Sequence, residues 1–245
     1  MSAFSRVLCL ALAASLFLLP NAGRAQEAPQ PVPATAPAAT AKPNSTLNSS
    51  TEAAKKAIAD AVMKMKNNDA DGALRSLNQA LTLNPNATGA YVLRASIFYE
   101  KKQYAQAEDD FKSAARLAPT NVVLKFNLVE MKFVQKQYDV ARPGYLALEG
   151  DSDLGDFASY KVFLCDLYGG HEAAARKELD TFDDAMGNPS YYFANAAWDL
   201  YHKNIEDARS WLTSASRIYP APKFTTYGQT LRDLGYLPIP PPKSP

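Results

Sequence analysis

The chain has 245 residues, and 47% of them are hydrophobic, which is enough apolar material for a folded core of one or two domains. Its formal net charge is only +1. That balance argues against a dedicated nucleic-acid-binding protein, because such proteins usually carry a strong basic excess.

The first 25 residues have the pattern of a secretory signal peptide. Arg6 supplies a positive charge, residues 7–19 form an uncharged apolar run, and small residues lead up to Ala25. We expect export to the periplasm or cell envelope with cleavage after Ala25; secretion and an uncleaved anchor are the alternatives. Because the run is short for a bilayer, no stable membrane insertion is expected after cleavage.

Cleavage would leave a nearly neutral chain with one cysteine. Without Arg6 and Arg24, the 26 basic residues fall to 24, against 25 acidic ones. Cys9 would also be lost, so Cys165 has no partner for an intrachain disulfide. The mature protein must therefore be stabilised by packing.

Two proline-rich segments flank the rest of the chain. Residues 26–50 contain five prolines and no aromatic residue, which predicts a disordered linker that holds the folded region away from the export site. A ligand for a proline-motif receptor is the alternative interpretation. Residues 236–245 form a shorter proline-rich tail.

Residues 51–235 are repetitive. Ala73, Leu77 and Ala80 lie on one face of a helix, at positions i, i+4 and i+7. Similar apolar triplets begin at four more alanines, spaced 34, 34, 34 and 33 residues apart: Ala107, Ala141, Ala175 and Ala208. Five copies at one period predict a repeated structural unit.

Each period fits a helix–turn–helix. Three copies have a proline twelve residues after the leading alanine, at Pro85, Pro119 and Pro220, where proline stops a helix. The pattern resembles the tetratricopeptide repeat family, and residues 86–121 are its clearest copy. The resemblance implies an all-α, right-handed superhelical solenoid of about five helical hairpins and a function in binding proteins or peptides.

We place the hairpins at residues 54–87, 88–121, 122–155, 156–188 and 189–220. Residues 223–235 follow as a capping helix, with an apolar stripe for the stack and a polar face for water. Pro143 and Gly144 lie inside the expected second helix of the third hairpin, so this helix should start late or kink. We expect a seam between repeats near residues 142–156.

No catalytic or metal-binding constellation is recognisable, and the chain is expected to be neither an enzyme nor a cofactor-binding protein. His171 and His202 have no nucleophile motif beside them, and Cys165 lies in an apolar helical segment. The acidic stretch from Asp151 to Asp156 fails the calcium-loop pattern, because its sixth position is Asp156 instead of glycine.

A row of large apolar residues is the candidate binding site. In the tetratricopeptide family the first helices of successive hairpins line a concave groove, and the matching positions here are Met65, Tyr99, Phe133, Tyr168 and Tyr201, with Phe126 beside them. Aromatic rows suit extended peptides or the apolar face of a helix. Alternatively, each aromatic residue packs against the next hairpin.

The function predicted from these features is an exported scaffold that binds a polypeptide partner in this groove. A structural spacer or self-assembling envelope component is the alternative. Self-association is compatible with either, and no nucleic-acid partner is expected.

Overall fold

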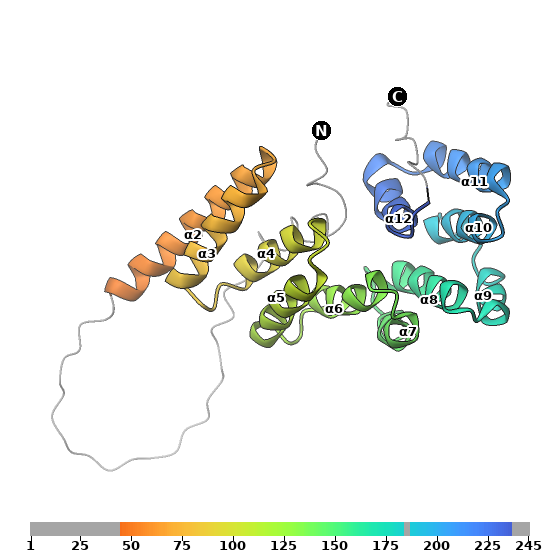
Figure 1. Cartoon of the computed structure of the whole chain (residues 1–245). Coiled ribbons are helices and arrows are strands. Elements are labelled where there is room, and N and C mark those ends of the chain that lie inside the picture. The colour runs from red at the N-terminus through yellow and green to blue at the C-terminus, as the bar shows by residue number, and fades with distance from the viewer. Residues whose placement is uncertain (1–44, 184–186, 237–245) are drawn as a thin grey trace, which may run out of the picture.

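The computed structural model describes residues 45–183 and 187–236. The predicted signal peptide, most of the predicted linker and the tail beyond Tyr236 lie outside these residues. Within the described ranges the chain is all-helical, with eleven helices and no strand (Figure 1).

Ten helices pair into five successive hairpins, and the eleventh closes the array. The pairs are α2 (Ser45–Lys66) with α3 (Ala70–Leu83), α4 (Thr88–Glu100) with α5 (Tyr104–Leu117), α6 (Val122–Val134) with α7 (Tyr138–Leu146), α8 (Gly155–Gly169) with α9 (Glu172–Leu179), and α10 (Pro189–Tyr201) with α11 (Ile205–Ile218). The last helix, α12 (Ala221–Asp233), packs on α10. The predicted solenoid of five hairpins and a capping helix is confirmed. Figure 1 shows the hairpins following one another along a curve, with α12 folded back towards its inner side.

The first helix begins earlier than the sequence pattern suggested. α2 starts at Ser45, so the last six residues of the predicted linker belong to this helix. The last proline of the linker is Pro43, and nothing after it prevents the backbone from entering a helix.

The repeated alanines explain how each hairpin closes. All five leading alanines are at most 1% exposed: Ala73, Ala107, Ala141, Ala175 and Ala208. Each lies in the second helix of its hairpin, and its single methyl group lets the two helices approach closely. The apolar faces of neighbouring hairpins then bury one another, as in other repeat arrays.

The turns inside the hairpins share one backbone conformation. A residue with positive φ recurs at spacings of 34, 34, 34 and 33 residues: Asn68, Lys102, Lys136, Gly170 and Lys203. Only the fourth hairpin places a glycine at this left-handed position, where other residues are strained. The turn geometry therefore repeats more faithfully than the residue type.

The third and fourth hairpins have short second helices. α7 has nine residues and α9 has eight, whereas α3, α5 and α11 each have fourteen. Of the two outcomes expected for α7, the late start is wrong and the kink stays a prediction. The helix begins at Tyr138, the repeat equivalent of Tyr104 in α5, and ends early at Leu146 with Pro143 inside it. At Gly144 a Cβ atom would lie 2.5 Å from a methyl group of Val129, so α7 also approaches α6 closely.

No helix among the described residues is long and apolar enough to cross a bilayer.

Candidate functional site

The predicted aromatic row lies on the first helices of the hairpins, and most of it is enclosed. Four of its six members are less than 10% exposed: Met65, Tyr99, Phe126 and Phe133. Tyr168 and Tyr201 are half-buried. The row therefore supplies much of the packing between hairpins, as the alternative interpretation stated, and only its C-terminal part has appreciable exposed surface.

In the C-terminal half, Tyr138 connects the rings of the row into a continuous series of ring contacts, although it is not itself a member of the row. Tyr138, at the start of α7, lies between Phe133 and Tyr168, with ring centroids 5.3 and 6.2 Å away. Tyr168 then meets Tyr201 at 5.6 Å. Edge-on and tilted arrangements of this kind stabilise aromatic pairs beyond the area that they bury.

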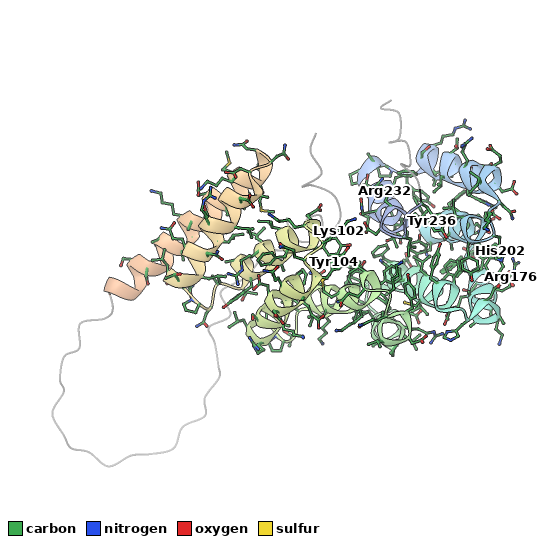
Figure 2. All side chains as sticks on the ribbon, viewed as in Figure 1. Lys102, Tyr104, Arg176, His202, Arg232 and Tyr236 are labelled. Atoms are coloured by element: carbon green, nitrogen blue, oxygen red, sulfur yellow. The ribbon has the colours of Figure 1, made fainter. Side chains whose placement is uncertain are left out.

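The end of α12 reaches the same row. The hydroxyl of Tyr99 donates a hydrogen bond to Asp233 Oδ2 at 3.2 Å, across 134 residues of sequence. Gly235, with φ of +91°, turns the chain after α12, and the Tyr236 ring lies 6.0 Å from that of Tyr168. Figure 2 shows Arg232 and Tyr236 facing Lys102 and Tyr104 from the opposite side of the curve. A helix end of the chain itself thus lies against the predicted groove.

A buried ion pair lies beneath the row, and the sequence pattern did not reveal it. Lys161 Nζ on α8 lies 2.8 Å from Glu130 Oε1 on α6, and these residues are 1% and 3% exposed. The other Glu130 oxygen accepts a hydrogen bond from the Tyr145 hydroxyl. Lys161 Nζ also lies 4.0 Å from the ring centroid of Phe133. The sequence did not single out these two residues, because α6 also contains Lys125 and Lys132 and α8 also contains Asp156 and Asp166.

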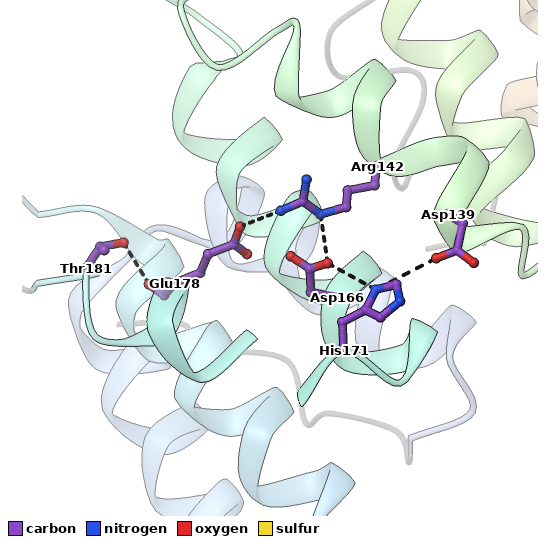
Figure 3. A network of polar contacts seen from close by, with 6 residues as sticks. All are labelled: Asp139, Arg142, Asp166, His171, Glu178 and Thr181. Atoms are coloured by element: carbon purple, nitrogen blue, oxygen red, sulfur yellow. Dashed lines mark hydrogen bonds and ion pairs between the residues drawn. The ribbon is translucent and has the colours of Figure 1, made fainter. Parts of the chain in front are cut away.

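A second polar cluster joins α7, α8 and α9 (Figure 3). Arg142 on α7 donates through Nε to Asp166 Oδ1 at 2.7 Å and through Nη2 to Glu178 Oε1 at 3.3 Å. His171, in the turn between α8 and α9, has Nδ1 at 3.4 Å from Asp166 Oδ1 and 3.8 Å from Asp139. The predicted seam is therefore bridged by charged side chains.

The cysteine, the second histidine and the acidic stretch considered in the sequence take part in packing, a surface contact and a turn. Burial raises the pKa of the Cys165 thiol to about 12, which keeps it protonated and unreactive. His202 is held by Glu172 at 2.9 Å and by the Trp198 carbonyl at 2.8 Å, on the surface. Asp151 accepts hydrogen bonds from the backbone N–H groups of Asp153 and Leu154, so its carboxylate orders a turn. Among the described residues, no group of three acidic, histidine or cysteine side chains is placed to hold a metal ion.

Comparisons with known proteins give the fold an independent basis. No protein-family model matches the chain, and no curated protein sequence matches it significantly. Solved structures do match it. A double mutant of MamA is 15% identical and has a TM-score of 0.54, with 68% of this chain and 94% of that chain covered.

Two further solved structures also match the chain. PilW, described as a widely conserved type IV pilus biogenesis factor, is 18% identical with a TM-score of 0.52, over 78% of this chain and 87% of that chain. PilF of Pseudomonas aeruginosa is 17% identical with a TM-score of 0.51, over 76% and 93%. All three are tetratricopeptide repeat proteins. Together with the 34-residue period, these likenesses establish that the chain has the tetratricopeptide repeat fold.

Proposed function

We propose that this protein is an exported scaffold that binds a polypeptide partner along the C-terminal part of its aromatic row. The observation that carries this proposal is the contact between the row and the end of α12. The Tyr99 hydroxyl donates a hydrogen bond to Asp233, and the Tyr236 ring packs against the ring of Tyr168. A surface that accepts one helix end of its own chain offers the aromatic area and hydroxyl groups that a second polypeptide requires.

The fold and the N-terminus support the two halves of this proposal separately. Solenoids of stacked hairpins present extended surfaces that suit polypeptide recognition. The N-terminal pattern of Arg6, an apolar run and a small residue at Ala25 is typical of exported proteins. PilW, one of the similar structures, is described as a pilus biogenesis factor, which is compatible with a role at the cell envelope.

The burial pattern decides which residues can test partner binding. Phe133 is 2% exposed and lies against Lys161, so its truncation would cost about 3–5 kcal/mol of stability and confound a binding assay. Tyr201 and Tyr236 are half-buried, so their truncation should disturb the packing less than truncation of Phe133. Ile218 on α11 is 53% exposed and is not a member of the row, which suits it as a control.

We expect the double variant Tyr201→Ala/Tyr236→Ala to lose about tenfold in partner capture, since aromatic residues dominate the energetics of such interfaces. The mature chain would be used to capture proteins from a native envelope extract, with quantification by mass spectrometry. Ile218→Ala should capture as the wild type does. A folded double variant that captures the same proteins equally well would refute the proposal that the partner binds along the aromatic row.

The spacer alternative makes a different prediction. A self-assembling component should show a mass that rises with concentration in light scattering, and its assembly should survive the removal of both tyrosines. Export is tested separately by N-terminal sequencing of the protein recovered from the envelope fraction. Cleavage as proposed leaves Gln26 as the first residue, whereas an intact Met1 would contradict it.

A further inference from the structure

The junction of α7, α8 and α9 holds two carboxylates with too few donors. Asp166 is 1% exposed, and Arg142 binds its Oδ1 atom. Its Oδ2 atom is buried and has no hydrogen-bond partner. Glu178 repeats this arrangement, because its Oε1 atom accepts from Arg142 while its Oε2 atom is buried without a partner. A buried acceptor without a donor is costly, and two at one arginine need a common explanation.

A shared proton supplies that explanation. Two carboxylate oxygens can form a hydrogen bond with each other only when one of the groups is protonated. Burial is the largest cause that raises the pKa of Glu178, to about 7, and the negative charge and hydrogen bond of Asp166 add to it. Arg142 opposes the increase through its positive charge. Glu178 is therefore the group that carries the proton in the folded protein.

The surroundings of Glu178 contain no second cation as close as Arg142. Its ionisable neighbours are Arg142 on α7, Glu149 in the segment after α7 and Asp166 on α8. Two of these three are acids, and His171 faces Asp166 from the turn that precedes α9. Ionisation of Glu178 would leave one guanidinium facing both Asp166 and Glu178 at short range.

We propose that this junction is a proton-operated joint, in which a proton shared by Asp166 and Glu178 holds α9 against α7 and α8 and its loss releases α9. The short length of α9 suits this role, because its eight residues bury only Ala175 and Leu179, with a further polar contact between Glu172 and His202. Asp166 lies two residues from Tyr168, and Arg142 shares α7 with Tyr138. The joint therefore lies beside the contact between the rings of Tyr138 and Tyr168.

The direction of the pH effect follows from the raised pKa of Glu178. A carboxyl group whose pKa rises from 4.5 to about 7 on folding adds stability that is complete below about pH 4.5 and is lost as the pH rises through 7. The hydrogen bond with Glu172 raises the pKa of His202, and this contact also involves α9. A variant of Glu178 is needed to separate the two contributions.

Hydrogen exchange of the full mature chain tests the joint. For the wild type, the protection of α9 amides relative to α5 amides, corrected for intrinsic rates, should fall on the order of tenfold between pH 5 and pH 8. In Glu178→Gln the amide N–H replaces the shared proton, so this ratio should not fall with pH and should stay at its wild-type value at pH 5. Glu206→Gln, on the exposed surface of α11, should behave as the wild type.

Trp198 offers a second readout within the same molecule. The Arg176 guanidinium on α9 lies 5.5 Å from the Trp198 ring centroid, so release of α9 should change the Trp198 fluorescence with a midpoint near pH 7. The His202 ring lies 4.5 Å from that of Trp198, so the change is measured as the difference between the wild type and Glu178→Gln. Asp166→Asn should shift that midpoint downward, because the negative charge beside Glu178 is gone. A protection ratio that does not change with pH, or a Glu178→Gln variant that keeps the wild-type change, would overturn the proposal.

Discussion

Lys161 on α8 and Glu130 on α6 form an ion pair of 2.8 Å in the middle of the solenoid, and water reaches almost none of either residue. The Tyr145 hydroxyl completes the set by donating to Glu130, so that α6, α7 and α8 meet at one polar point. The aromatic rings of Phe133 and Phe157 surround the ammonium group, with centroids 4.0 and 5.6 Å away. The pair is thus fixed by its partners and by the packing around it.

Breaking this pair from one side should be severe. Lys161→Met leaves Glu130 charged, buried and without its cation, and we expect a loss of about 3–5 kcal/mol in the free energy of unfolding. The double variant Lys161→Met/Glu130→Gln removes both charges while Tyr145 keeps an acceptor, so most of that loss should return. Urea denaturation at pH 7 measures both. A double variant no more stable than the single one would show that the charges themselves are required.

The left-handed turns offer a stabilising change. Lys136 has φ of +60° and is exposed, and glycine adopts this conformation without the strain of a side chain. Lys136→Gly should therefore raise the free energy of unfolding by about 0.5–1 kcal/mol. Gly170→Ala, at the equivalent turn with φ of +86°, is the reverse experiment and should destabilise by about 1 kcal/mol. Opposite signs in thermal denaturation are expected, and equal signs would contradict the argument.

The irregular middle of the array should be the first part to open. α7 and α9 have nine and eight residues, and Pro143 removes one backbone donor from α7. Their amides should therefore exchange faster than those of α5, which has fourteen residues and no proline. Native-state hydrogen exchange at pH 6 measures the difference. Equal protection in α5 and α7 would mean that no seam exists at the third hairpin.

The fold was predictable because its hairpins repeat about every 34 residues, and this spacing is visible in the sequence. Each hairpin needs a small residue where its helices cross, so Ala73 and its four counterparts mark the repeat in the sequence itself. The turn residues follow the same period, although their identities change from Asn68 to Lys102 to Gly170. The early end of α7 was less accessible. Pro143 indicated a disturbance there, but whether the helix started late or ended early depended on its packing against α6.

The candidate site was predictable in position but not in exposure. The spacing placed Tyr99, Phe133 and Tyr168 on successive first helices, where the structure also has them. Exposure depends on what covers each ring, and α12 contributes contacts from more than 130 residues away. The ion pair between Glu130 and Lys161 could not be predicted from the repeat spacing either. The two residues are 31 apart, so they do not occupy equivalent positions of a 34-residue repeat.

Gly155, at the start of α8, sets how the fourth hairpin joins the third. A Cβ atom on this residue would lie 2.3 Å from the Glu149 carbonyl oxygen, a backbone atom that cannot rotate away. Gly155→Ala should therefore cost about 1–3 kcal/mol, through displacement of the segment before α8. Gly150→Ala is the matched control, since a Cβ atom there meets nothing within 4 Å, and its effect should stay within about 0.5 kcal/mol. Urea denaturation measures the free energy of unfolding of both variants. If Gly155→Ala were as stable as Gly150→Ala, the close approach to Glu149 would not hold the two hairpins in register.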